Sequence, residues 1–288
     1  MKSYDLKNSG TLLIACTLNY TPDIAKNWAV SARSAGFDGD IVILTDLPPT
    51  EYSALLSENV FVFQIKRAKK FGMLALEKFW RFKRAAPHVE RFHHIYEFIK
   101  DLNYDHIITT DIKDVLFQLD PTRFVVNDSP NYLLVGGEGL NIEHETWGFE
   151  NLSNSVGFEE AKRIQSKEVL NVGVLIGSAC AIKTILHFIS TCAIGRSDPI
   201  ADQAMFNWVA HNSLLNIQLR ITTYDRADIV HLGTLLDPRV ADAYSVHHIH
   251  GKLPYFKDGQ YYNAAGQLYA IVHQYDRVPT NSVVISAK

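Results

Sequence analysis

The chain has 288 residues, 47% of them hydrophobic, and its 28 Lys and Arg residues nearly balance 31 Asp and Glu residues, which leaves a net charge of −3. This length and apolar content can bury a sizeable core, and we predict one domain spanning residues 1–288. A chain this close to neutral has no overall positive field to gather nucleic acid, so we expect no nucleic-acid partner.

The first half alternates buried strands with helices. Each predicted strand is a continuous apolar run, as burial on both faces of a sheet requires. The segments in chain order are a strand at Thr11–Cys16, a helix at Pro22–Ala35, strands at Asp40–Thr45 and Asn59–Ile65, a helix after Phe92 and a strand at His106–Asp111. This order predicts an α/β fold with a mostly parallel central sheet flanked by helices, and a Rossmann-like nucleotide-binding half over about residues 1–125.

The second half is less regular, and we predict a mixed half over about residues 126–288. Its predicted elements are strands at Tyr132–Gly136, Val169–Ile176 and Tyr269–His273 and helices at Ala181–Cys192 and Ala201–Ala210. The stretch from Glu138 to Glu168 is polar and long for a connection inside a compact domain, which indicates a functional loop or a partly helical insertion.

Polar side chains follow three of the predicted parallel strands. They are Thr17, Asn19 and Tyr20 after the first strand, Thr45 and Asp46 after the second, and Asp111 and Asp114 after the fourth. Open α/β sheets bind ligands at this edge, outside the carboxyl ends of their strands. No Gly-x-Gly-x-x-Gly or Walker-type loop opens a helix, which disfavours a nicotinamide dehydrogenase or a P-loop enzyme. A nucleotide bound at this edge would need a metal ion for its diphosphate.

Asp111 and Asp114 are three residues apart where the backbone leaves a strand, so both carboxylates can point to one ligand position. Mg²⁺ or Mn²⁺ prefers a few carboxylate oxygens and completes its shell with water and phosphate oxygens. The alternative is that Asp111 caps the following turn while Asp114 pairs with Lys113 or Arg123 in solvent. For two aspartates considered alone, this alternative is favoured.

The segment Thr-Asp-Ile-Lys-Asp-Val-Leu-Phe-Gln-Leu-Asp-Pro, residues 110–121, resembles the Thr-Asp-x-Arg-Asp-Val-x-Phe-Gln-x-x-Pro-Phe segment of a group of nucleotide-sugar glycosyltransferases with the GT-A fold. Further blocks resemble that group in the same order. They begin at Arg91-Phe92, Glu138-Gly139, Leu170-Asn171, Asp202-Gln203 and Ile271-Val272, and the last one ends at Arg277. The resemblance covers roughly residues 90–277 and implies a single GT-A-like domain whose second half binds sugar and acceptor. Many such enzymes have Asp-x-Asp, whereas two residues separate the pair here, and we rank Asp114 ahead of Asp111 as the metal ligand.

The resemblance also implies a site for Mn²⁺ or Mg²⁺ and a UDP-sugar donor. A C-terminal histidine supplies the third metal ligand in related enzymes, and here His273 competes with His248. The residues expected to bind the donor are Thr17, Asn19, Tyr20, Thr45, Arg91, Asp111, Asn171, Gly173 and Arg277. Gly173 lets a sugar approach the backbone closely, although a bulge in a strand would explain it equally well.

The expected catalytic residues are Asp202, Gln203 and Glu138. In the resemblance, Asp202 binds the sugar hydroxyls and Gln203 lies near the anomeric carbon, as in retaining enzymes such as glycogenin and bacterial lipopolysaccharide galactosyltransferases. An ordinary charge effect at a helix N-terminus explains Asp202 without a sugar. If the reaction inverts the anomeric centre, a carboxylate must deprotonate the acceptor, and Glu138 is the candidate base.

A basic stretch interleaved with aromatic residues runs from Lys66 to Arg84. We favour a solvated helix face; contacts to the donor and attraction to an anionic membrane are the alternatives. Met1 to Gly10 is polar and no run of about 18 apolar residues occurs, so we expect a cytoplasmic protein without a signal peptide or transmembrane segment, with peripheral membrane contact as the alternative. Cys16, Cys180 and Cys192 lack Cys-x-x-Cys spacing and are predicted to be reduced.

The leading hypothesis from the sequence is a divalent-metal-dependent glycosyltransferase that moves a sugar from a nucleoside diphosphate, UDP being favoured, to a hydroxyl acceptor. A hexosyltransferase that retains anomeric configuration is favoured, and surface glycan or glycolipid synthesis is one setting for it. One alternative is a metal-dependent sugar-nucleotide hydrolase or nucleotidyltransferase, which would use the same carboxylates. Another is a non-catalytic protein that binds a sugar nucleotide.

Overall fold

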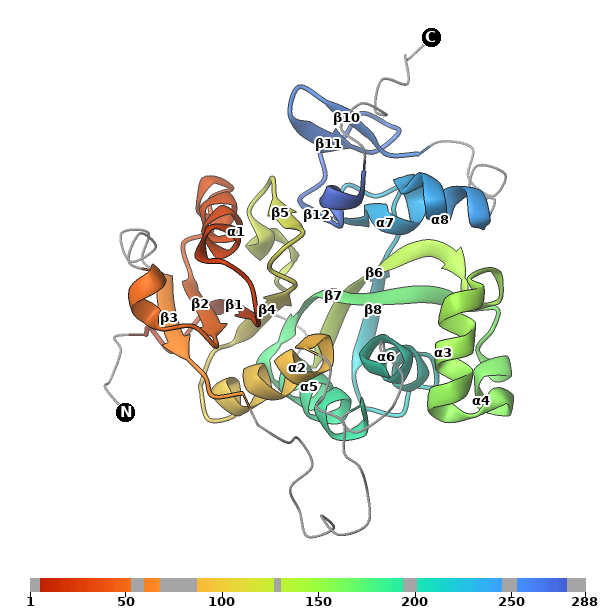
Figure 1. Ribbon diagram of the computed structural model, residues 1–288, viewed down its shortest axis with the longest axis horizontal. Helices are drawn as coiled ribbons and strands as arrows, with labels where there is room; N and C mark the ends of the chain where they lie inside the picture. Colours follow the sequence, from red (N-terminus) through yellow and green to blue (C-terminus); the bar gives the residue numbers. More distant parts are fainter. Residues whose placement is uncertain are drawn as a thin grey trace, which may run out of the picture.

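The computed structural model describes residues 6–52, 60–67, 87–126, 131–193, 201–244 and 253–278. Its main sheet has seven strands in the order β3-β2-β1-β4-β7-β6-β8 (Figure 1). The strands are β1 (Thr11–Thr17), β2 (Asp40–Thr45), β3 (Val60–Gln64), β4 (His106–Thr110), β6 (Tyr132–Asn141), β7 (Glu168–Ser178) and β8 (Gln218–Thr222). Within this sheet only β7 runs antiparallel to its neighbours, β4 and β6. The predicted α/β fold with a mostly parallel sheet is therefore confirmed.

Helices cover both faces of the main sheet. They are α1 (Pro22–Ser34), α2 (Pro87–Ile99), α3 (Thr146–Val156), α4 (Phe158–Arg163), α5 (Ala179–Ala193), α6 (Ala201–His211), α7 (Leu232–Leu236) and α8 (Pro238–Ala243). Successive side chains of β1 point to opposite faces, so Leu12 and Ile14 join one core with α2, α5 and α6, while Leu13 and Ala15 join a second core with α1. Burial on both faces is the reason that β1 is apolar between its two terminal threonines.

A second, smaller sheet has the order β5-β12-β9 and joins distant parts of the chain. Its strands are β5 (Val115–Phe117), β9 (Ile229–His231) and β12 (Ile271–His273). The strand β12 lies in the middle, antiparallel to β5 and parallel to β9. Two further strands, β10 (Tyr255–Lys257) and β11 (Gln260–Tyr262), form a hairpin above this sheet in Figure 1.

The segment from Glu138 to Glu168 is the partly helical insertion that the sequence indicated. The strand β6 extends through its first residues to Asn141, and the 3-10 turn η3 (Ile142–His144) and the helices α3 and α4 follow. Two other 3-10 turns are η2 (Pro121–Phe124) and η4 (Tyr275–Arg277). All three cysteines are free, as predicted.

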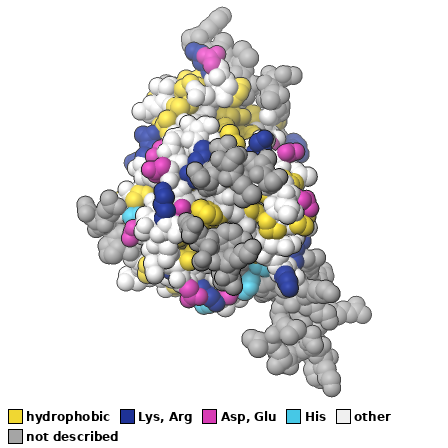
Figure 2. Space-filling model, turned by 90° about the vertical axis from the view of Figure 1, so that its left-hand side faces the viewer, with side chains coloured by type: hydrophobic (Ala, Val, Ile, Leu, Met, Phe, Trp, Pro, Cys, Tyr) yellow, Lys and Arg dark blue, Asp and Glu magenta, His cyan; other side chains and the backbone are white. Residues whose placement is uncertain are grey.

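The surface in Figure 2 carries interspersed acidic and basic side chains, and among the described residues drawn there neither charge forms one continuous field. In the part of the chain that the structure describes, no helix combines the length and apolarity needed to cross a bilayer. Most of the basic stretch from Lys66 to Arg84 lies outside the described residues. Arg67 is described, and its side chain is only 10% exposed and pairs with Glu90 at 2.8 Å. The prediction of a solvated side chain is therefore wrong for this residue.

Candidate functional site

The small sheet brings Asp114 next to His273. Val115 in β5 lies opposite His273 in β12, in register across an antiparallel pair. The backbone amide of Gln274 also donates a 2.8 Å hydrogen bond to the carbonyl of Asp114. Two segments far apart in the sequence are therefore held side by side at the point where each carries a polar side chain.

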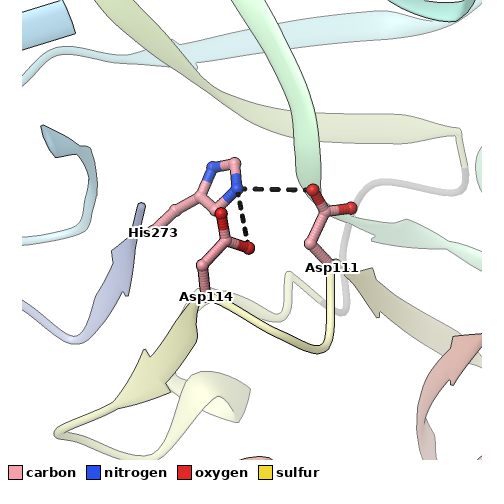
Figure 3. A group of neighbouring side chains, drawn as sticks. All are labelled: Asp111, Asp114 and His273. Atoms are coloured by element: carbon pink, nitrogen blue, oxygen red, sulfur yellow. Dashed lines mark ion pairs between the residues drawn. The ribbon is translucent and has the colours of Figure 1, made fainter. Parts of the chain in front are cut away.

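Asp111 approaches the same point from the main sheet. It follows the last residue of β4, and its backbone amide donates a 2.7 Å hydrogen bond to the carbonyl of Gly173 in β7. Nε2 of His273 lies 3.4 Å from Oδ2 of Asp111 and 3.5 Å from Oδ1 of Asp114 (Figure 3). One ligand atom from each of the three residues lies within 4.8 Å of the others.

The trio fits a hard divalent cation. Ligand atoms bound at about 2.1 Å to one ion lie between about 3 and 4.2 Å apart, which is the spacing of the His273 nitrogen from each carboxylate oxygen. The His273 side chain is only 2% exposed, and its Nε2 has no hydrogen-bond partner among the described residues. A buried nitrogen aimed at two carboxylates needs either a proton to share or a metal to bind.

The sequence alternative of a surface ion pair for Asp114 is wrong. Lys113 instead pairs with Asp276, with 2.8 Å between Nζ and Oδ2. The predicted cap is not formed either, because no backbone amide of the bend at residues 112–114 donates to the Asp111 carboxylate, which contacts Arg91 instead. Burial opposes ionisation of Asp114, but the neighbouring His273 and nearby arginines outweigh it and lower the pKa of Asp114 to about 2.

Arg91 on α2 connects the trio to Asp202. Its Nη1 contacts Oδ1 of Asp111, and its Nη2 lies 3.8 Å from Oδ2 of Asp202 at the start of α6. Burial lowers the pKa of Arg91, although the charge of Asp202 opposes that change. Burial likewise raises the pKa of Asp202, whose Oδ1 is buried and has no hydrogen-bond partner within the described residues. This oxygen can accept a hydrogen bond from a ligand hydroxyl.

Glu138 is the centre of a buried hydrogen-bond cluster. One oxygen, Oε1, accepts from Asn171 at 2.6 Å and from Gln203 at 3.1 Å, while Oε2 accepts from Thr234 at 2.7 Å. The Asn171 amide oxygen in turn accepts from the backbone amide of Gly173 at 2.7 Å. These bonds fix the orientation of the side-chain amides of Asn171 and Gln203, which line a cavity described below.

Gly173 makes room for the His273 ring. A Cβ atom at this position would lie 2.2 Å from Cε1 of His273 and 2.8 Å from Oδ1 of Asn171. The residue lies in an irregular part of the pairing, because the register of β6 against β7 shifts between Val135 and Gly137. The bulge that the sequence offered as an alternative is thus present, and the neighbouring imidazole is a reason for glycine that the sequence did not indicate.

Two adjoining cavities meet at the trio. One of about 420 Å³ is lined by Asn19, Tyr20, Asp114 and others. The other, of about 620 Å³, is lined by the Glu138 cluster, Asp202 and His273. Both cavities share the residues His88, Arg91, Asp111 and Arg277. The guanidinium of Arg277 makes no hydrogen bond or ion pair with the described residues, so its donors are available at this junction.

Two expected donor contacts lie elsewhere. Thr17 and Thr45 are fully buried and line neither cavity, and Thr45 shares a 2.9 Å hydrogen bond with Tyr52. The loop after β1 reaches the first cavity through Asn19, whose side chain accepts from Arg67 at 2.9 Å. The rival metal ligand, His248, lies outside the described residues.

His231 is a site residue that sequence reasoning missed. Its Nδ1 lies 2.8 Å from Nδ1 of His273, and the two residues are direct neighbours in register across β9 and β12. Burial lowers the pKa of His231 well below its ordinary value, and the charge of His273 acts in the same direction. The sequence held a signal that could have identified His231, because the tripeptide Ile-Val-His occurs twice, at residues 229–231 and at residues 271–273.

Comparison of the sequence with protein-family models gave no match, and comparison with curated protein sequences gave none either. The function is therefore inferred from the side chains themselves and from how the fold arranges them.

Proposed function

We propose that this chain is a divalent-metal-dependent glycosyltransferase with a GT-A-like domain, and that it transfers a sugar from a nucleoside diphosphate to a hydroxyl acceptor. The observation that carries the proposal is the Asp111, Asp114 and His273 trio at the carboxyl edge of the sheet, between two adjoining cavities. A donor has two parts joined by a diphosphate, and this arrangement provides one space for each part. The motif resemblance around residues 110–121 supports UDP as the nucleotide.

The three trio side chains would hold the metal ion, with Asp114 and His273 as the buried ligands. When bound, Mn²⁺ or Mg²⁺ acts as a Lewis acid that offsets the charge developing on the departing diphosphate. Arg277 is placed to add cationic donors at the cavity junction, and Lys113 lines the first cavity while neutralised by Asp276. Arg91 offsets the two carboxylates that it touches, Asp111 and Asp202, and so limits their mutual repulsion.

The second cavity would hold the donor sugar. The free oxygen of Asp202 accepts from a sugar hydroxyl, and the amide groups of Asn171 and Gln203 are oriented by Glu138 to face the same space. Three donors already occupy Glu138, whose carboxylate has about four acceptor positions. This favours Glu138 as a residue that orients its neighbours over a base that takes the acceptor proton.

The hydrogen bonds of Glu138 bear on stereochemistry. An inverting reaction needs a carboxylate free to receive the proton of the acceptor hydroxyl. In a retaining reaction, the bond from the anomeric carbon to the diphosphate oxygen breaks and the bond to the acceptor oxygen forms on the same face. The departing diphosphate oxygen then receives the acceptor proton. Glu138 is occupied, and Asp202 is assigned to the sugar hydroxyls in this proposal, so neither is left to act as the base that inversion needs, and we infer retention for this reason.

The acceptor would enter the second cavity from the side of α3 and α8. Trp147 lines that wall and is 50% exposed, and Tyr244 donates a 2.9 Å hydrogen bond to Glu145 beside it. An exposed aromatic ring next to fixed polar groups is the kind of surface on which a ligand with both apolar and hydroxyl-bearing faces binds.

The test is incubation of the protein with a panel of UDP-sugars and Mn²⁺, with and without EDTA, followed by product analysis. We expect UDP together with free or transferred sugar, and loss of UDP release on chelation and in Asp114→Asn. The matched control is Asp258→Asn, which removes a carboxylate from the exposed turn between β10 and β11 and should keep full activity.

Two results would contradict the proposal. Release of UMP and a sugar phosphate would indicate a metal-dependent hydrolase or nucleotidyltransferase that uses the same carboxylates. No product, combined with a melting temperature raised by UDP and Mn²⁺, would indicate a non-catalytic protein that binds a sugar nucleotide, because a ligand specific for the folded state raises its stability.

A further inference from the structure

The two histidines at the ends of β9 and β12 face each other through the same ring atom. The distance between Nδ1 of His231 and Nδ1 of His273 is 2.8 Å, and their rings are nearly perpendicular, at 86°. Both side chains are buried, with 0% of His231 and 2% of His273 exposed. Two nitrogens this close need a single shared hydrogen, because two lone pairs or two N–H groups would repel.

The position of that hydrogen decides what His273 can do at its other nitrogen. If Nδ1 of neutral His273 carries the hydrogen and donates it to His231, Nε2 of His273 has a free lone pair directed at the two aspartates. If His231 is the donor, neutral His273 must carry its hydrogen on Nε2 and cannot bind a metal there. Metal binding at Nε2 of His273 therefore requires that His231 accept, rather than donate, the hydrogen bond between the two Nδ1 atoms.

The surroundings hold both rings in this geometry. Gly136 in β6 lies against His231, and a Cβ atom there would be 2.3 Å from Nε2 of that ring. Gly173 in β7 plays the same part for His273. Strand pairing sets the separation of the two backbones, since His231 and His273 are register partners. Each ring thus lies against a glycine, in the place where a larger residue would put its Cβ atom.

We propose that His231 is a positioning residue of the metal site, which accepts the Nδ1 hydrogen of His273 and so fixes the tautomer in which Nε2 is a metal ligand. This inference rests on the proposed metal site. Ligating histidines commonly donate their second ring N–H to a fixed acceptor, and loss of that acceptor typically weakens metal binding by about 10- to 100-fold. His231 binds neither the metal nor the substrate itself.

The experiment measures Mn²⁺ affinity by electron paramagnetic resonance of the free ion, with no substrate present. The variants are His231→Asn and His231→Leu, which have nearly the same shape but differ in hydrogen bonding. We expect His231→Leu to lose affinity by about 10- to 100-fold, and His231→Asn, whose side-chain oxygen can accept from His273, to recover most of it. A purely structural role would affect both variants alike.

A second measurement needs no variant. Nuclear magnetic resonance of the unaltered chain with isotopically labelled histidine, in the presence of Mg²⁺, should show the His273 hydrogen on Nδ1 and none on Nε2. Equal Mn²⁺ affinity in folded His231→Leu and the unaltered chain would overturn the inference while leaving the metal site intact. A hydrogen on Nε2 in the Mg²⁺-bound protein would overturn the inference and would also exclude His273 as a metal ligand. Absence of Mn²⁺ binding by the unaltered chain, matched by Asp114→Asn, would overturn the proposed function and this inference together.

Discussion

Substitution of Gly173 by alanine should weaken the proposed metal site without replacing any of its three ligand residues. The new Cβ atom would lie 2.2 Å from Cε1 and 2.7 Å from Nε2 of His273. Carbon atoms in contact are about 3.5 Å apart, so the imidazole must move by about 1 Å. Metal–ligand distances tolerate only about 0.2 Å. We therefore expect Gly173→Ala to weaken Mn²⁺ binding by at least about 100-fold, more than the loss of an orienting contact alone.

The matched control lies in the same strand. Gly177→Ala would also overpack β7, because its Cβ atom would meet the carbonyl oxygen of Tyr132 at 2.5 Å, far from His273. Both variants should lose about 1 to 3 kcal/mol of unfolding free energy, as overpacked sites do. Titration with Mn²⁺ and thermal unfolding of each variant separate the two effects. Equal Mn²⁺ affinity in Gly173→Ala and Gly177→Ala would refute the reasoning.

Three further predictions concern charge. Burial raises the pKa of Glu90, but its histidine and arginine partners outweigh burial and lower this pKa to about 2. The ionised carboxylate therefore contributes up to about 3 kcal/mol of stability above pH 4.5, and this contribution is lost as the pH falls towards 2. The difference in unfolding free energy between the unaltered chain and Glu90→Gln should shrink over that range, and a difference independent of pH would count against this. Arg277→Met should weaken UDP binding about tenfold in calorimetry, whereas Arg163→Met on the exposed face of α4 should leave it unchanged. Equal UDP affinities of the two variants would exclude Arg277 from the proposed diphosphate site. Mn²⁺ at 100 times its dissociation constant should add about 2.7 kcal/mol to the unfolding free energy, and a similar gain in the Asp111→Asn, Asp114→Asn double variant would place the ion elsewhere.

Long buried strands were predictable from the sequence, and short ones were not. The run from Leu12 to Cys16 is apolar throughout because both of its faces are covered, and this continuous apolar run is a clear signal of a buried strand. The strands β5 and β9 have three residues each, too few for any periodicity to show. Their positions follow from pairing with β12, a long-range contact that no local pattern records.

The same distinction holds for the candidate site. Asp111 and Asp114 could be selected from the sequence because they are carboxylates at the end of a predicted strand, and the structure places His273 next to them. Thr17 was chosen by its place at the end of a strand, but its side chain faces the covered layer and the cavity wall is built by the loop beyond it. His231 was not selected because its role depends on contact with Nδ1 of His273, and the two residues become neighbours only after the chain has folded.

The small sheet β5-β12-β9 has a consequence for the order in which the protein becomes competent. Asp114 is made early during synthesis, but its neighbour β12 is one of the last strands to leave the ribosome. The main sheet can form in a nascent chain, since domains begin to fold from their N-terminal part. The proposed metal centre cannot, because its three residues come together only when β12 lies between β5 and β9. A chain that ended before β12 would therefore lack His273 and also Asp276 and Arg277, which line the first cavity.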